Sequence, residues 1–158
     1  MSDWRKRFLL PIVLLGVSCA WGCAPGANAK VWPYEMELGG VAIHVEVART
    51  PAQLHRGLMY RDRLDPDWGM LFVFPRQEPL QFYMKNTKIP LSIAFLDEGL
   101  VVRDIQDMTP FDETTHVSKV PARYALEMEQ GWFARRNVAP GTTAKFSSEL
   151  DAFLGRKP

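Results

Sequence analysis

The stretch YEMELGGVAIHVEVA, residues 34–48, decides the fold. Apolar and polar side chains alternate over residues 34–38 and again over residues 41–48, as is typical of strands with one buried face. Gly39 and Gly40 separate the two alternating runs. A Gly-Gly pair in that position is a signal for a two-residue turn between antiparallel strands. The sequence therefore predicts a β-hairpin over this stretch.

A short helix is predicted directly after the hairpin. Thr50 is a suitable N-cap, Pro51 fits the first helical position, and Gln53 completes a capping box, so the helix should end near Gly57. Further strands are expected at Met70–Phe74, Leu80–Lys85, Leu91–Leu96, Leu100–Asp107, Ala122–Glu129 and Thr142–Phe146, with a helical turn in Gly131–Asn137 and a last helix that is capped by Ser148 and ends near Gly155. Many short strands favour a mainly β fold: a compact β-sandwich or partly open, jelly-roll-like barrel with one or two short helices.

The 158 residues correspond to about one folded domain. The hydrophobic fraction of 47% and the charged fraction of 23% are those of a globular protein, which argues against a disordered chain. We expect residues 1–29 to be a cleavable export signal and residues 30–40 to form a short arm and the first strand. Residues 41–146 should form a single β domain, and residues 147–158 a short C-terminal helix and tail.

The N-terminus has the pattern of a secretory signal. Basic residues at positions 5–7 precede an apolar run over residues 8–17. That run is short for a membrane-spanning helix of about 20 residues, but it fits a signal-peptide core of about 7–15 residues. Small residues at Ala27 and Ala29 suit a signal peptidase, so cleavage is expected after Ala29. The sequence predicts an exported protein, periplasmic or extracellular.

Two alternatives for the N-terminus stay open: an uncleaved anchor, and a lipoprotein acylated at Cys23 or Cys19. Trp21 is bulky for a lipidation signal before Cys23, and Leu15 lies one place too early for Cys19. Attachment to a membrane is expected only if one of these cysteines carries lipid. Cleavage after Ala29 would instead remove both cysteines, leaving neither a thiol nucleophile nor a disulfide.

Charge argues against nucleic acid as a partner. The chain has a net charge of +1, and its first 29 residues hold three basic residues and one acidic residue, so the remainder has a net charge of −1. Binding to a phosphate backbone requires clustered positive charge. We therefore expect no DNA or RNA partner.

Neither a metal nor another cofactor is predicted. His44, His55 and His116 have no paired spacing of the kind that holds zinc. Methionines are numerous and could bind Cu(I), but Met is also a routine core filler, and we favour that interpretation. Dinucleotide, phosphate-loop and nucleophile-elbow motifs are absent from the sequence.

Several residue groups together resemble one known family. These are Gly57-Leu58-Met59 with Arg61, Gly69-Met70-Leu71-Phe72 with Phe74, Phe82-Tyr83-Met84-Lys85-Asn86-Thr87 followed by Ile89-Pro90-Leu91, Pro121 with Tyr124, Leu126-Glu127, Gly131 and Pro140-Gly141. Over about residues 41–146 the chain resembles the uncharacterised bacterial and archaeal family called domain of unknown function 192. The resemblance implies a jelly-roll-like β-sandwich, often behind an export signal, and no established activity.

The sequence departs from that family's pattern at Ser92, where an Asp is expected two residues after Pro90. If the Asp has a charge role with Lys85, that role is weakened here or has moved to Asp97 or Glu127.

The candidate ligand site is a polar cluster at the end of a predicted strand. Lys85, Asn86 and Thr87 offer hydrogen-bond donors and acceptors for a carboxylate or for sugar hydroxyls. Tyr83 should share a strand face with Lys85 and could cover the ligand. The remaining candidates are Arg56, which could join Lys85 in holding an anion, Glu127, and His116 in a loop. The structural alternative is that Asn86-Thr87 only turns the chain and that Lys85 forms an internal ion pair with Glu127 or Asp97.

The sequence favours a non-catalytic, exported β-sandwich that binds a small polar or anionic ligand, a glycan or a protein partner. Two alternatives stay open. One is an enzyme that acts on envelope polysaccharide through paired carboxylates, with Glu127 or Asp104 as a member. The other is an interaction domain without a pocket.

Overall fold

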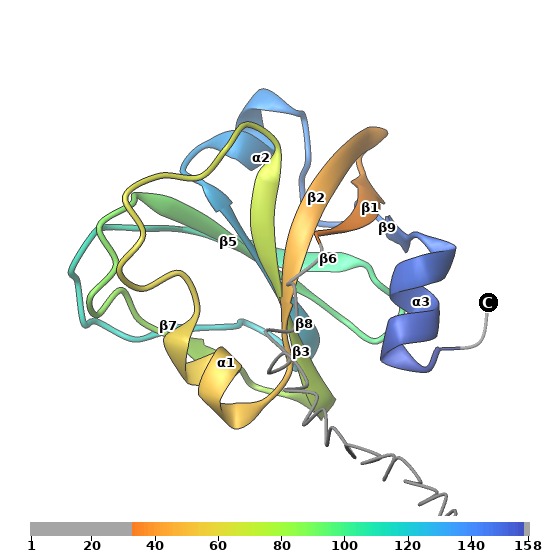
Figure 1. The fold of residues 1–158 in the computed structure, drawn as a ribbon, viewed down its shortest axis with the longest axis horizontal. Coiled ribbons are helices and arrows are strands. Elements are labelled where there is room, and N and C mark those ends of the chain that lie inside the picture. Colours follow the sequence, from red (N-terminus) through yellow and green to blue (C-terminus); the bar gives the residue numbers. More distant parts are fainter. Residues whose placement is uncertain (1–32, 157–158) are drawn as a thin grey trace, which may run out of the picture. The chain divides into compact units, whose positions relative to one another are not determined.

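The structure is a computed structural model that describes residues 33–156 (Figure 1). Its elements are β1 (Tyr34–Leu38), β2 (Val41–Ala48), α1 (Pro51–Arg56), β3 (Trp68–Glu78), β4 (Gln81–Phe82), β5 (Leu91–Leu96), β6 (Val102–Met108), β7 (His116–Val117), β8 (Ala122–Glu129), α2 (Trp132–Arg135), β9 (Ala144–Phe146) and α3 (Ser148–Leu154). The mainly β prediction is confirmed, although the described part has three short helices where one or two were expected.

Seven strands form one curled sheet in the order β6-β5-β8-β3-β2-β1-β9. The β2–β3 pair is parallel, because α1 and a loop carry the chain back between them, and the other neighbours are antiparallel. Val101 and Thr143, next to the two edge strands, form an isolated bridge. The sheet is therefore a half-barrel. Of the two predicted forms, a compact sandwich and a partly open barrel, it corresponds to the partly open barrel. β4 and β7 make a small second sheet.

The predicted hairpin is present with the expected turn. β1 and β2 pair in register from Tyr34 opposite Val45 to Leu38 opposite Val41. Gly39 and Gly40 have φ angles of 61° and 79°. Such left-handed angles are readily adopted by glycine and are those of the primed turns that match strand twist.

Two apolar clusters lie on opposite faces of the sheet. Successive residues of the central strands belong to alternate clusters, so Leu71 and Leu126 enter the first, and Phe72 and Ala125 the second. β1, α2 and α3 also contribute to the first cluster, whereas the segment after α1 and strand β4 contribute to the second. Burial on both faces explains why β5 is apolar at each position except Ser92, rather than alternating between apolar and polar residues. The candidate site lies in the second cluster.

Several predicted boundaries were wrong, including the starts of β3, β6 and β9, each of which differs by two residues. β3 continues through Pro75, because its pairing with β8 is interrupted between Val73 and Glu78 and Pro75 therefore need not donate a ladder hydrogen bond. The strand expected over Leu80–Lys85 is reduced to β4, since the chain turns after Phe82. The N-cap of α3 is Ser147, one residue before the predicted position.

Some predictions concern residues that the structure does not describe. The export signal, cleavage after Ala29, both cysteines and most of the N-terminal arm lie outside residues 33–156. Within that range, none of the helices has the length and apolar character needed to cross a membrane.

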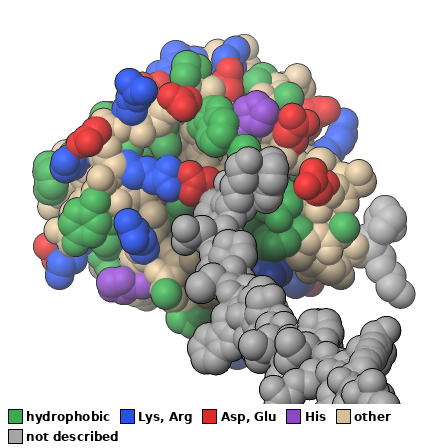
Figure 2. All heavy atoms as spheres, in the orientation of Figure 1, with side chains coloured by type: hydrophobic (Ala, Val, Ile, Leu, Met, Phe, Trp, Pro, Cys, Tyr) green, Lys and Arg blue, Asp and Glu red, His purple; other side chains and the backbone are tan. Residues whose placement is uncertain are grey.

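On the face shown in Figure 2, acidic and basic side chains are interspersed. Most of the charged side chains are paired in ion pairs such as Arg61 with Glu46 and Lys88 with Asp62. This face therefore has no broad area of a single sign.

Candidate functional site

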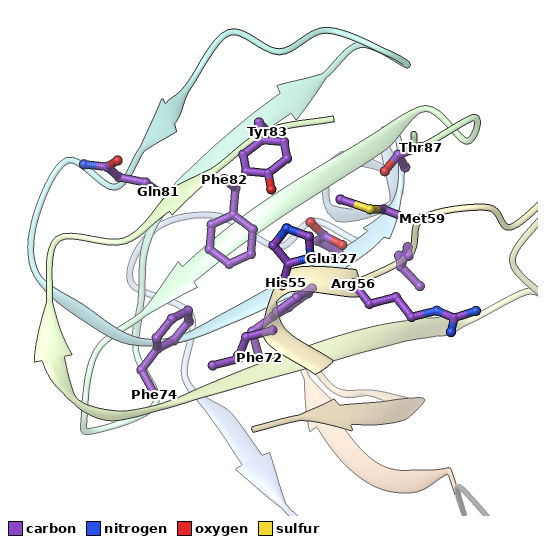
Figure 3. A pocket seen from close by; sticks show the side chains of 13 residues that line it. His55, Arg56, Met59, Phe72, Phe74, Gln81, Phe82, Tyr83, Thr87 and Glu127 are labelled. Atoms are coloured by element: carbon purple, nitrogen blue, oxygen red, sulfur yellow. The ribbon is translucent and has the colours of Figure 1, made fainter. Parts of the chain in front are cut away.

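A cavity of about 250 Å³ lies between α1, β3, the β4 segment and β8 (Figure 3). Its lining residues are Leu54, His55, Arg56, Gly57, Leu58, Met59, Phe72, Phe74, Gln81, Phe82, Tyr83, Thr87 and Glu127. Most of these side chains are apolar or aromatic, and Glu127 is the one carboxyl group among them.

The end of α1 is fixed close to the sheet and forms one wall of the cavity. The Thr50 hydroxyl accepts a hydrogen bond from the Gln53 backbone N–H, and the Gln53 side chain accepts one from the Thr50 N–H, which is the predicted capping box. Gly57 ends the helix with φ 45°. A Cβ at Gly57 would lie 3.2 Å from the Phe72 ring, so glycine allows the close approach of helix and sheet.

Phe82 is the centre of the aromatic wall. Its ring packs edge-on against Phe72, with 5.0 Å between ring centroids, and also contacts Phe74 and Phe95 at 6.3 Å and 5.8 Å. Pairing of Phe82 with His116 of β7 holds the backbone in place. Edge-on packing of this kind stabilises aromatic pairs beyond simple burial, so the wall is well packed.

Glu127 lies in the middle of β8, between apolar neighbours. Its cross-strand partners are Met70 of β3 and Ile93 of β5. The residue is only 5% exposed, and its buried Oε2 has no hydrogen-bond partner among residues 33–156. Burial raises the pKa of Glu127 to about 8, because a dry environment disfavours the charged carboxylate. At neutral pH the carboxyl group is therefore mostly protonated and able to donate a hydrogen bond.

Comparisons with known proteins identify the family. Residues 34–146 match the family model of domain of unknown function 192, DUF192, whose description is an uncharacterized ACR. The chain belongs to DUF192. The search of curated proteins gave no match.

Two crystal structures are similar to this DUF192 chain. A protein from Sinorhizobium meliloti, described as a proposed transcription regulator, is 34% identical, with a TM-score of 0.69 over 73% of this chain and 95% of that one. A protein of unknown function from Novosphingobium aromaticivorans is 32% identical, with a TM-score of 0.68 over 71% of this chain and 84% of that one.

The DUF192 fold brings four of the seven predicted site residues to the cavity and leaves three outside its lining. Those at the cavity are Arg56, Tyr83, Thr87 and Glu127, and those outside are Lys85, Asn86 and His116. Figure 3 shows the Arg56 guanidinium extending away from Glu127. The paired grip of Arg56 and Lys85 on an anion is therefore not assembled in the cavity.

Lys85 is exposed, and neither of its predicted roles has the expected geometry. Tyr83 and Lys85 do not share a strand face, because β4 ends at Phe82. An ion pair with Asp97 or Glu127 is absent from the described residues, since Asp97 instead accepts a hydrogen bond from Arg103 at 2.7 Å. The exposed charge of Lys85 remains in water.

Asn86 has a structural role in this conformation. Its φ is 54°, and its side chain donates a hydrogen bond of 2.9 Å to the Tyr60 hydroxyl. The Tyr60 N–H in turn donates to the Asn86 carbonyl oxygen at 2.9 Å. Asn is one of the few residues that tolerate this backbone conformation, which agrees with the prediction that the segment turns the chain.

His116 and Asp104 belong to a polar cluster outside the cavity lining. The His116 Nδ1 lies 3.2 Å from the Gln106 Oε1, and Gln106 and Lys119 each donate a 2.7 Å hydrogen bond to Asp104. Burial alone would raise the pKa of Asp104, but hydrogen bonds from Lys119 and Gln106 lower it overall. Asp104 is therefore a paired carboxylate, apart from Glu127.

Ser92, where the family pattern suggested Asp, lies away from the cavity. It alternates with Ile93, the partner of Glu127, and so faces the other side of the sheet. Its hydroxyl donates to the Asp107 carboxylate and accepts a 2.8 Å hydrogen bond from the Gly131 N–H. Ser92 thus joins β6 to the start of α2, and its position gives no charge role with Lys85.

The cavity also contains residues that sequence reasoning missed, chiefly Met59, Phe72 and Phe82. These apolar positions give the same sequence signal whether they fill a core or border a cavity. Clusters of three or more His, Cys, Asp or Glu side chains suitable for a metal do not occur in residues 33–156.

Proposed function

We propose that this DUF192 domain is a non-catalytic binding module that takes a small ligand, with an apolar body and one polar group, into the cavity over Glu127. The observation that carries the proposal is the Glu127 carboxyl group, which is buried at the cavity without a partner for Oε2. A buried polar group without a hydrogen bond costs about 1–3 kcal/mol. A ligand that hydrogen-bonds to Glu127 would offset this cost.

The size and composition of the cavity favour a small molecule. Its volume of about 250 Å³ is slightly below the range of roughly 300–1,000 Å³ that is usual for ligand pockets. A single ring or a short branched chain fits this space. Apolar walls with one polar group at the sheet are the usual composition of such sites.

Binding without catalysis is supported by the carboxyl groups. Hydrolysis of polysaccharide ordinarily requires two carboxyl groups on either side of the glycosidic bond. Glu127 is the one carboxyl group that lines the cavity, and Asp104 is held by Lys119. An interaction domain without a pocket is less well supported, because the domain has a cavity of about 250 Å³ with Glu127 in its lining.

We propose that the domain works outside the cytoplasm, on the basis of the basic and apolar pattern of residues 5–17 and the small residues before position 30.

A thermal-shift screen of the full-length chain against small polar compounds tests the binding function. A ligand at a hundred times its Kd stabilises the folded state by about 2.7 kcal/mol. We expect stabilising compounds to lose most of their effect on Glu127→Leu, which keeps an apolar side chain of similar size at the cavity. The matched control is Glu129→Leu on the same strand, where Glu129 is exposed and paired with Arg135.

A screen without stabilising compounds would contradict the binding function. So would compounds that shift the melting temperature of both variants as much as that of the unmodified chain.

A further inference from the structure

We infer that the ligand of this cavity is a small organic cation: a primary ammonium group on an apolar body, with the ammonium bound to the Glu127 carboxylate. This inference rests on the proposed function and specifies the class of ligand. It is supported by the positions of the acidic, basic and aromatic side chains that line the cavity.

The aromatic and acidic side chains that line the cavity suit a positively charged ligand. Phe72, Phe74, Phe82 and Tyr83 all contribute rings to its lining. Aromatic faces carry partial negative charge and attract ammonium ions. The one acidic side chain among the lining residues is Glu127, and it is buried, with 5% of its surface exposed. Four aromatic rings and one carboxyl group in the same lining form an environment suited to an organic cation.

The basic lining residues lie at the solvent side. His55 and Arg56 form the last turn of α1, and both are exposed. In Figure 3 the Arg56 guanidinium points away from Glu127 and from the rings of Phe82 and Tyr83. Charges in water are strongly screened, whereas an ion pair at buried Glu127 is not. Arg56 therefore does not cancel the preference of the interior, and the His55 imidazole, which Figure 3 draws beside Glu127, belongs to an exposed residue.

Other titratable groups around Glu127 lie beyond its apolar neighbours. On the side of β3, Met70 separates it from Glu46, which forms a bidentate pair with Arg61 at 2.6 Å and 2.7 Å. On the side of β5, Ile93 separates it from Gln106, whose side chain contacts His116 and Asp104. The Tyr83 phenol and the His55 imidazole complete the titratable groups of the lining.

An ammonium ligand replaces the proton of Glu127. In the free protein, burial holds the pKa of Glu127 at about 8, so about one molecule in ten is ionised at pH 7. Binding of the cation stabilises the carboxylate, and one proton leaves Glu127 for solvent. Because only the ionised form of Glu127 binds the cation, the apparent affinity is proportional to the fraction of molecules in which Glu127 is ionised. It should therefore rise about tenfold from pH 6 to pH 7 and level off above pH 8.

The experiment uses three probes with one apolar ring: cyclohexylmethylamine, cyclohexylmethanol and cyclohexanecarboxylate. The amine resembles a lysine side chain, whose pKa is about 10, so it stays charged between pH 6 and pH 8. Kd values are measured by calorimetry with the full-length chain at pH 6, 7 and 8. The proton released at pH 7 is found by repeating the titration in buffers of different ionisation enthalpy.

We expect the amine to bind at least tenfold more tightly than the alcohol at pH 8, and the carboxylate to bind most weakly. Glu127→Gln should weaken amine binding at least tenfold and abolish its pH dependence, while alcohol binding changes less than threefold. Glu129→Gln should leave all three affinities unchanged. The pH series on the unmodified chain gives a readout that does not depend on the folding of a variant.

Alcohol or carboxylate binding that exceeds amine binding would overturn the cation inference and leave the proposed function standing. Amine binding that is independent of pH and of Glu127→Gln would overturn it as well. A failure of all three probes to bind at millimolar concentration, together with a negative thermal-shift screen, would count against the proposed function itself.

Discussion

Replacing Glu127 with glutamine is expected to make the protein more stable at pH 8, by several kcal/mol, while its stability at pH 4 changes little. Glutamine keeps the size of the side chain and cannot ionise. The change in the free energy of unfolding therefore measures the free-energy cost of burying an ionisable carboxyl group at Glu127.

The direction follows from the raised pKa of Glu127, from 4.5 to about 8. Between these two values the unfolded chain has lost the proton and the folded chain keeps it, so the free energy of unfolding falls as pH rises, by about 1.4 kcal/mol per pH unit. Below pH 4.5 both states are protonated and the contribution is constant. Over 3.5 pH units the upper limit is about 5 kcal/mol.

Urea unfolding of the full-length chain and of Glu127→Gln at pH 4, 6 and 8 measures this effect. The difference between the two proteins isolates Glu127, because the other titrating groups are shared. Glu129→Gln serves as the control and should follow the unmodified chain at each pH. A stability difference that stays constant from pH 4 to pH 8 would refute a neutral, buried Glu127.

The second large effect is expected for Gly69→Ala in β3. A Cβ at Gly69 would overlap the backbone carbonyl oxygen of Glu127 and the sulfur atom of Met128. The carbonyl belongs to the neighbouring strand and cannot rotate away, so β3 and β8 must separate beside the cavity. Overpacking usually costs about 1–3 kcal/mol, and a clash with backbone should reach about 3 kcal/mol or more.

Unfolding in urea again gives the size of the loss, with Gly99→Ala as the control. A Cβ at Gly99 would lie 3.3 Å from the Asp97 Oδ1 in an exposed turn, so the loss there should stay below about 1 kcal/mol. Equal stabilities for the two glycine variants would show that the packing of β3 against β8 is looser than described above.

Local elements were predictable because their signals are local. The alternation over residues 34–48 correctly predicted β1 and β2, and the capping box at Thr50 correctly predicted the start of α1. The bounds of β5 and β8 agree with those that were predicted. Each of these signals depends on side chains within about ten residues.

The arrangement of the strands could not be derived from those patterns. β8 lies between β3 and β5, although residues 79–121 of the chain separate β3 from β8. Such pairings depend on burial of both sheet faces, and an apolar run alone does not name its neighbour. The family resemblance implied the general fold but neither the strand order nor the curl of the sheet.

The candidate site was partly predictable. Glu127 stands out in sequence as an acidic residue within the otherwise apolar run 125–128 of a strand, and the structure places it at the cavity. Lys85 was misplaced because alternation was continued past Phe82, where the strand ends. The rings of Phe72 and Phe82 border a cavity instead of filling a core. This difference depends on how the chain packs, and a sequence pattern does not contain that information.

The most direct test of the account is a carbon-13 NMR titration of the full-length chain, labelled at the glutamate side-chain carboxyl carbons. The resonance of Glu127 is assigned by its absence from the spectrum of Glu127→Gln. We expect it to titrate near pH 8, while the exposed glutamates titrate near 4.5. A Glu127 resonance that titrates with the exposed glutamates would contradict the buried, neutral carboxyl group on which the proposed ligand site depends.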